Sequence, residues 1–123
     1  LDVRLMIDAE HSYFQPAIDN VVLDVQRVFN TGERALIFNT FQCYLAETDG
    51  KVLEHIERSE REGWQFAAKV VRGAYMVLER ERAASLGAPS PIHETLEDTH
   101  EVSILLCTVT FHANLAHSLT RSP

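Results

Sequence analysis

The sequence predicts an α/β fold built from consecutive βα units. Short apolar runs start near residues 3, 35 and 65, so one cycle takes about thirty residues, the length of a βα unit. The runs are apolar throughout rather than alternating, which is typical of parallel strands covered on both faces. Helical periodicity follows each run. Such a series forms either a doubly wound sheet or part of a barrel, and the pattern alone does not choose between them.

The first unit combines a strand over residues 3–8 with a helix that begins at Pro16, because proline is tolerated in the first helical turn. The turn-forming residues 30–32 end this helix. Its apolar side chains recur at helical spacing and predict the buried face: Ala17, Ile18, Val21, Val22, Val25, Val28 and Phe29.

The second unit has a strand over residues 35–40 and a helix that stops at Gly63. The third has a strand over residues 65–71 and a helix over residues 78–86. Residues 102–111 are apolar and β-branched, which fits a buried strand or a short helix. The apolar face of the second helix is formed by Val52, Leu53 and Ile56.

Composition excludes several classes of function. The chain has 123 residues, 46% hydrophobic and 24% charged, which fits one globular domain. Its net charge of -7 argues against a nucleic-acid partner, because phosphate binding needs clustered Lys and Arg. Cys43 and Cys107 give no disulfide framework and are compatible with a reducing compartment. No apolar run is long enough to span a bilayer.

The six histidines have no metal-ligand spacing, so we predict no metal site and expect them at the surface. We expect Trp64 in the core and the charged run over residues 79–82 on a solvated helix face. The histidines are His11, His55, His93, His100, His112 and His117.

Polar side chains gather at the carboxyl end of each predicted strand. Ligands bind at this end in parallel α/β folds, so the recurrence favours one shared site over three separate loop features. The side chains are Asp8 and Glu10 after the first strand, Asn39 and Gln42 after the second, and Lys69 and Arg72 after the third.

Three segments resemble, in order and spacing, strand-end motifs of proline dehydrogenases: IDAEHSYFQPAID, IFNTFQCYL and AAKVVRGAYMVLERERAASLG. The resemblance is to the monofunctional mitochondrial type. It implies that residues 1–100 are part of a (β/α)8 TIM-type barrel, followed by a divergent tail over residues 101–123. It also implies FAD, oxidation of L-proline to Δ¹-pyrroline-5-carboxylate by hydride transfer to flavin N5, and a membrane quinone as acceptor. The implied location is the matrix side of the mitochondrial inner membrane.

The resemblance also assigns site residues. Lys69 takes the place of the basic residue near flavin N5, and Asp8 that of an active-site acid, so these two are the predicted catalytic residues. Asp8 also belongs to the predicted substrate site, and Lys69 to the cofactor site. The other predicted cofactor-binding residues are Ala9, Asn39, Arg72, Gly73 and Ala74, and the other substrate-binding residues are Val70 and Tyr75.

The chain is shorter than the roughly 250 residues of a complete barrel. We expect a substrate-side lysine, a flavin-facing histidine, the arginine pair that binds the proline carboxylate, and any targeting segment to lie outside it. Three βα units leave two open sheet edges, which favours self-association. We therefore expect the purified chain to be poorly folded or oligomeric, without FAD absorbance.

Three alternatives stay open. Hydroxyproline dehydrogenase is a sibling activity that differs in pocket residues near the substrate C4. A non-catalytic remnant that acts as an interaction module is the second. The third is a metal-dependent lyase or an aldolase that uses Asp8, Glu10 and Lys69, since a lysine on a strand can form a Schiff base.

Overall fold

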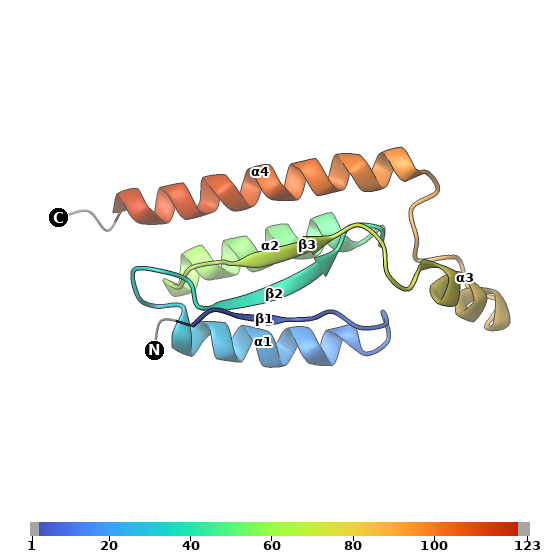
Figure 1. Ribbon diagram of the computed structural model, residues 1–123, viewed down its shortest axis with the longest axis horizontal. Helices are drawn as coiled ribbons and strands as arrows, with labels where there is room; N and C mark the ends of the chain where they lie inside the picture. Colours follow the sequence, from blue (N-terminus) through green and yellow to red (C-terminus); the bar gives the residue numbers. More distant parts are fainter. Residues whose placement is uncertain (1–2, 121–123) are drawn as a thin grey trace.

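The computed structural model describes residues 3–120, and the side chains of residues 3–113. Strands and helices alternate as far as β3, after which two helices follow (Figure 1). The strands are β1 (Leu5–Ile7), β2 (Ile37–Gln42) and β3 (Ala68–Val71). The helices are α1 (Gln15–Phe29), α2 (Thr48–Glu62), α3 (Met76–Ser85) and α4 (Leu96–Thr120). The predicted series of βα units is confirmed.

The three strands form one parallel sheet in the order β1-β2-β3. Ile7 is opposite Asn39 in the first pair, and Asn39 is opposite Ala68 in the second, so all three carboxyl ends meet at one edge of the sheet. The helix α3 lies beyond this edge (Figure 1). Within the described residues β1 and β3 each have one unpaired edge, as predicted.

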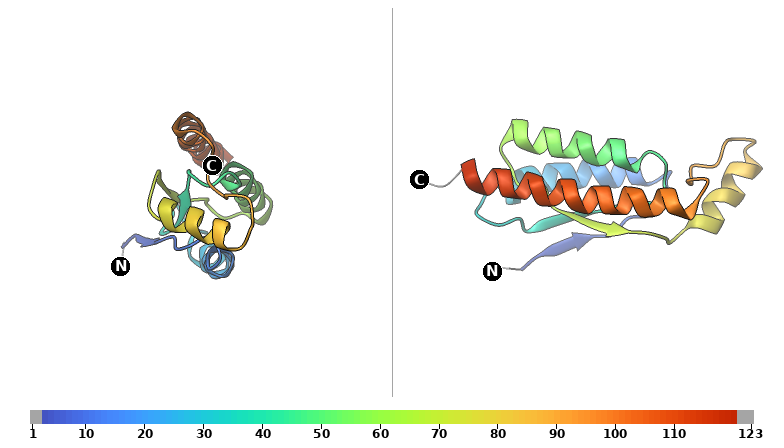
Figure 2. Two further views of the ribbon diagram at one scale, coloured as in Figure 1. Left: turned by 90° about the vertical axis from the view of Figure 1, so that its right-hand side faces the viewer. Right: turned by 90° about the horizontal axis from the view of Figure 1, so that it is seen from above.

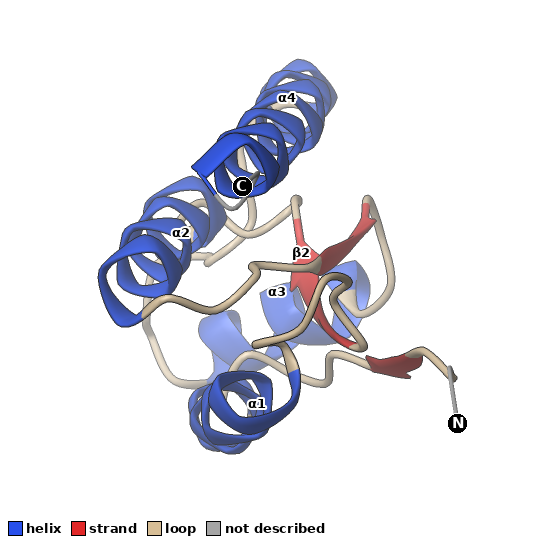
Figure 3. Ribbon diagram, turned by 90° about the vertical axis from the view of Figure 1, so that its left-hand side faces the viewer, coloured by secondary structure: helices blue, strands red, loops and turns tan. Residues whose placement is uncertain are grey.

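The helices cover one face of the sheet and leave the other open. Seen from the end, α1 and α2 lie on the same side of β2, and α4 lies next to α2 (Figure 3). The core is enclosed between the sheet and these helices. It contains Trp64, as predicted, and its other buried members are Leu23, Phe41, Cys43, Val52, Ile56, Phe66 and Leu106.

Polar side chains attach α1 to the sheet. Asn30, which caps the helix, is fully buried, and its Oδ1 accepts hydrogen bonds from the backbone N–H groups of Leu36 and Ile37, each at 2.9 Å. Its Nδ2 donates to the carbonyls of Ile37 at 2.8 Å and Gln65 at 3.0 Å. Because one side chain joins the starts of β2 and β3, it helps to set the relative position of the strands that carry the site.

The buried face of α1 differs from the predicted one. Val21, Val28 and Phe29 were predicted to be buried but are more than half exposed. Gln15 and Gln26 are buried instead, and Nε2 of Gln26 donates to the backbone carbonyls of Ile37 in β2 and of Ala67, just before β3, at 3.1 Å each. These two bonds satisfy the amide nitrogen of Gln26, so its burial avoids the penalty of an unpaired donor.

The C-terminal segment forms neither a strand nor a short helix. Residues 102–111 lie inside the 25-residue helix α4, which packs on α2 and β3 (Figures 1 and 2). Leu106 of α4 is fully buried in the core. The helix runs back along β3, which makes α4 the crossover helix of the third unit in place of α3. Residues 121–123, predicted as the end of a divergent tail, lie outside the described residues.

Two further surface predictions are wrong. His55 is buried and makes an edge contact with the ring of Phe41, at 5.4 Å between centroids. Burial lowers the pKa of His55, so the neutral imidazole is the form that the core favours. In the charged run over residues 79–82, Glu79 is buried while the other members are exposed. The side chain of His117 lies outside the described side chains.

Candidate active site

The strand β2 presents alternate side chains to the two faces of the sheet. On the helix face, Nδ2 of Asn39 donates to Oδ1 of Asp19 in α1 at 2.9 Å, and Phe41 belongs to the core. Thr40 and Gln42 have the opposite parity and point to the open face, where they line a pocket. The open face at the carboxyl edge is therefore where polar groups of the three strands meet.

The first row across this face contains an ion pair. Thr40 is opposite Lys69 in the β2–β3 register, and its Oγ1 donates to the carbonyl of Ile7 at 2.7 Å. The Lys69 ammonium donates to Oδ1 of Asp8. Their side chains are 35% and 72% exposed, and an ion pair this exposed stabilises a fold by about 0–1 kcal/mol. The pair therefore contributes little to folding, and its charges are accessible to a ligand.

A second row lies further toward the loops. Nε2 of Gln42 donates to the carbonyl of Glu10 at 2.8 Å, and the Tyr75 hydroxyl donates to Oε2 of Glu10 at 2.9 Å. This bond to the Glu10 carboxylate raises the pKa of the Tyr75 phenol. Behind the row, the hydroxyl of fully buried Tyr44 donates to Oε1 of Gln42 and accepts from the backbone N–H of Tyr75 at 3.3 Å. Both hydrogen-bonding ends of the Gln42 amide are thus fixed.

The two rows border a pocket of about 250 Å³ on the open face. This is below the range of roughly 300–1,000 Å³ that is typical of ligand sites. It combines a cation, two carboxylates, an amide and small apolar side chains. Its lining residues are Asp8, Ala9, Glu10, Thr40, Gln42, Lys69, Val71, Ala74 and Tyr75.

Five of the predicted site residues meet in this pocket: Asp8, Ala9, Lys69, Ala74 and Tyr75.

The other four have different surroundings. Asn39 faces α1, and Val70 packs against the core on the helix side of the sheet. The Arg72 guanidinium contacts Nε2 of His100 at the start of α4 rather than the pocket. In the part of the chain that the structure describes, a Cβ at Gly73 would meet only the sulfur of Met76, at 3.4 Å, so the described fold does not require glycine there.

Glu10, Thr40, Gln42 and Val71 also line the pocket. Glu10 and Gln42 were expected in the shared site at the strand ends although the resemblance gave them no role, whereas Thr40 and Val71 were not predicted. For Val71 the signal was available. Side chains two residues apart on a strand share a face, so Lys69 at the site implies Val71 and not Val70. In the parallel register Thr40 is opposite Lys69 and Gln42 is opposite Val71, so both lie on the same face as Lys69.

No group of three or more His, Cys, Asp or Glu side chains in the described part of the chain is arranged to hold a metal ion. Among residues 3–120, no helix combines the length and the apolar character needed to cross a membrane.

A sequence model of proline dehydrogenase matches residues 1–113. The chain belongs to the proline dehydrogenase family. It is similar to "Proline dehydrogenase 1, mitochondrial" of Drosophila melanogaster, 46% identical over 121 residues, which are 98% of this chain and 16% of the relative. It is 53% identical over 100 residues to the protein of the same name from Homo sapiens, which covers 81% of this chain and 16% of the relative.

Among solved structures, the chain is similar to proline utilization A from Bdellovibrio bacteriovorus inactivated by N-propargylglycine, with a TM-score of 0.78 and 17% identity. The match covers 96% of this chain and 14% of that one. It supports the fold, the parallel α/β type of a TIM-like barrel.

The family is one of oxidoreductases. The predicted family and barrel class are confirmed, and the chain spans about a sixth of its curated relatives. The predicted boundary at residue 100 stays a prediction; α4 runs through it.

Proposed function

We propose that this chain is the flavin-side portion of an FAD-dependent mitochondrial enzyme that oxidises L-proline to Δ¹-pyrroline-5-carboxylate. The observation that carries the proposal is the pocket at the carboxyl edge of the sheet, where Lys69 meets Asp8 in a member of the proline dehydrogenase family. The further proposals are a membrane quinone as electron acceptor and a place on the matrix side of the inner membrane. The mitochondrial names of the relatives support the compartment.

The donor set fits a flavin. An isoalloxazine ring presents carbonyl oxygens and ring nitrogens along one edge and is apolar on its faces. The Lys69 ammonium, the Gln42 amide and the Thr40 hydroxyl supply polar groups, while Ala9 and Val71 supply small apolar surface. We therefore propose that Thr40, Gln42 and Lys69 lie at the polar edge of the ring. Asn39 and Val70 are not proposed to contact the ligand, because both face the helices.

Gly73 and Ala74 would hold the cofactor through their backbone. Ala74 lines the pocket, and among the described residues a Cβ at Gly73 would meet no atom within 4 Å except the sulfur of Met76. A requirement for glycine at this position must then come from a ligand that approaches the backbone closely.

When bound, the flavin supplies the oxidising chemistry by accepting a hydride from C5 of proline. The Lys69 ammonium is placed to stabilise the negative charge that develops beside it. Asp8 holds that ammonium by its hydrogen bond, so the charge is in position before reaction. Glu10 holds the Tyr75 hydroxyl, which directs the phenol ring to one side of the pocket as a wall for the pyrrolidine ring.

The isolated chain should bind proline poorly and self-associate. Recognition of the proline carboxylate by paired arginines is proposed for a part of the enzyme that this chain does not contain. Leu5 and Met6 of the edge strand β1 are each 53% exposed, and an open apolar edge favours pairing with another chain. This surface is the observation that favours the second candidate, a non-catalytic interaction module.

An exchange of segments tests the proposal. The matching 121 residues of the Drosophila relative are replaced by residues of this chain, and flavin absorbance and proline oxidation are measured. We expect a yellow, active enzyme, and a Lys69→Met chimera that folds but loses at least about 100-fold in kcat, as when one stabilising donor is removed. Lys51→Met, on the surface of α2, is the control. An inactive chimera, or full activity without Lys69, would refute the proposal.

A further inference from the structure

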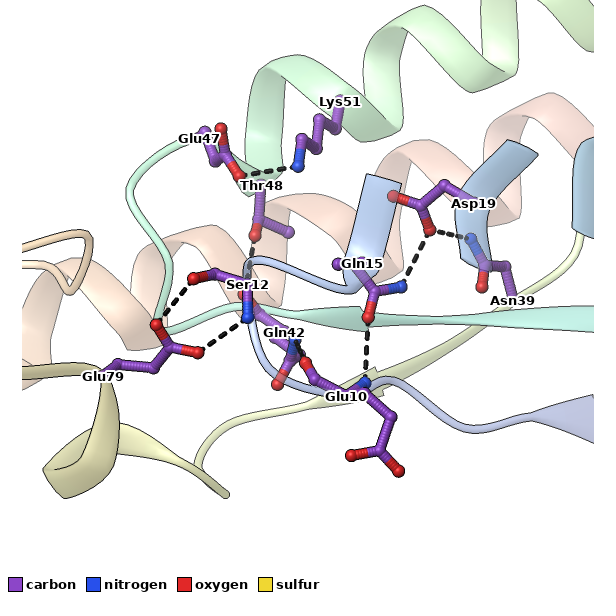
Figure 4. A network of polar contacts seen from close by, with 10 residues as sticks. All are labelled: Glu10, Ser12, Gln15, Asp19, Asn39, Gln42, Glu47, Thr48, Lys51 and Glu79. Atoms are coloured by element: carbon purple, nitrogen blue, oxygen red, sulfur yellow. Dashed lines mark hydrogen bonds and ion pairs between the residues drawn. The ribbon is translucent and has the colours of Figure 1, made fainter. Parts of the chain in front are cut away.

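The loop between β1 and α1, residues 8–14, carries two of the pocket's charged groups. Besides the contacts of Asp8 and Glu10 inside the pocket, the loop is held at three points (Figure 4). The backbone N–H of Glu10 donates to Oε1 of Gln15 at 2.9 Å. The carbonyl of Glu10 accepts from Gln42 at 2.8 Å. The third point is Ser12, whose backbone N–H and hydroxyl donate to the two carboxylate oxygens of Glu79 at 2.7 and 2.6 Å.

Glu79 differs from the other two anchors because it is charged and comes from α3. This helix follows β3, and β3 and β1 are the two outer strands of the sheet. Its side chain is 3% exposed, and Nδ1 of His11 approaches it at 3.4 Å. Burial alone would raise the pKa of the Glu79 carboxyl, but the hydrogen bonds from Ser12 and His11 outweigh burial and leave the pKa below its ordinary value. Glu79 is therefore held as the ionised carboxylate, which is the form that accepts the hydrogen bonds from Ser12.

The strands β1 and β3 are not paired with each other, because β2 lies between them. Two contacts join their loops within the pocket, Asp8 with Lys69 and Glu10 with Tyr75, and both involve exposed groups. Exposed pairs hold a loop weakly, whereas a buried carboxylate with several donors makes strong charge-assisted hydrogen bonds.

We propose that Glu79, which lies outside the pocket, is a positioning residue of the site: by binding Ser12 it holds the β1–α1 loop so that Glu10 meets the Tyr75 hydroxyl. The proposal rests on the proposed function for its catalytic meaning. The His11 and Tyr75 rings are in contact, 4.1 Å apart between centroids and tilted by 37°, and this contact belongs to the same arrangement because His11 lies next to Ser12 and also contacts Glu79.

The test compares Glu79→Gln with Glu81→Gln in the chimera with the Drosophila relative, because the isolated chain is expected to self-associate. The first keeps shape but replaces one acceptor by a donor that faces the Ser12 donors; the second removes the same charge from an exposed position on the same helix. Three measurements by NMR are made: amide exchange at Ser12, the contact between the His11 and Tyr75 rings, and the titration of the Tyr75 phenol.

In Glu79→Gln we expect exchange at Ser12 to accelerate at least about tenfold, which is local opening. We also expect loss of the His11–Tyr75 ring contact and a lower pKa of the Tyr75 phenol as its bond to Glu10 breaks. Glu81→Gln should change none of these. Ser12→Ala, which removes one donor from the other side, should give the same changes more weakly.

A Tyr75 titration and a ring contact that stay unchanged in Glu79→Gln, while the variant remains folded, would overturn the proposal. A purely structural role would lower stability without moving the Tyr75 titration. None of these measurements needs flavin. A positive result here beside an inactive chimera would therefore refute the proposed function alone, and the reverse combination would refute only the role of Glu79.

Discussion

Replacing Asn30 by alanine should remove a large part of the stability of the chain. The side chain is fully buried and makes four hydrogen bonds, all to backbone groups of Leu36, Ile37 and Gln65. At about 1 kcal/mol for each bond, with a further cost for buried groups left unpaired, the loss is about 3–5 kcal/mol. Because domains of this size are stable by about 5–15 kcal/mol, this loss is a large part of the total.

Urea unfolding followed by circular dichroism and by the fluorescence of buried Trp64 measures this loss. With a urea dependence of about 2 kcal/mol per molar, the midpoint should fall by roughly 2 M without a change in slope. The matched control is Asn20→Ala, at an exposed position of the same helix, which should change stability by less than about 0.5 kcal/mol. A loss below about 1 kcal/mol for Asn30→Ala would show that this side chain does not join the strands.

Three other substitutions test separate parts of the account. Leu106→Ala should lower the free energy of unfolding by about 2–5 kcal/mol, as measured by urea unfolding. Leu105→Ala, at a neighbouring residue that is 43% exposed, should lower it by less than about 1 kcal/mol, and equal losses would contradict the packing of α4. Bonding to Arg27 lowers the pKa of Glu62 to about 2, so the contribution of Glu62 to folding stability is present above its ordinary pKa and is lost as the pH falls toward 2. In Glu62→Gln the stability should therefore depend less on pH in this range, as measured by acid unfolding, and an unchanged pH profile would refute this. Gly73→Ala should change the free energy of unfolding by less than about 0.5 kcal/mol but weaken flavin binding in the chimera. A larger loss of stability would contradict the free space found around Gly73.

The order of strands and helices could be predicted from the sequence because its signals are local. Gly63 illustrates this: it ends α2 with φ of 77°, a left-handed conformation that glycine adopts without strain. The predicted helix ends and the thirty-residue period depend on local signals of this kind, from residues that are close in the sequence. The carboxyl edge of a parallel sheet is likewise implied by topology alone, so Asp8 and Lys69 could be assigned to one edge before their contact was seen.

The face of each strand could not be predicted in the same way. In the middle strand β2 every side chain except Phe38 is buried, on the open face of the sheet as well as on the helix face, so polar and apolar residues occur on both and alternation gives no signal. Asn39 and Gln42 are both amides, but one binds Asp19 under a helix and the other lines the pocket. The assignment of Val70 beside Lys69 was avoidable, because adjacent strand residues face opposite ways.

Tertiary packing decided the remaining differences. Residues 102–111 have β-branched side chains that favour a strand, but a helix there buries Leu106 against the core and returns the chain along β3. Glu79 occurs in an alternating charged run that is typical of a solvated face, yet donors from Ser12, distant in sequence, make its burial favourable. Such partners are visible only once the fold brings them together.

The side-chain amide signals of Gln42 and Asn39 test most directly which face of the sheet receives the flavin. The chimera is freed of flavin and titrated with FMN, and both amides are followed by NMR with and without Lys69→Met. We expect the Gln42 amide to shift with added FMN, the Asn39 amide to stay unchanged, and the Gln42 shift to weaken without Lys69. A shift of Asn39 with an unmoved Gln42 would contradict the assignment of the flavin to the open face.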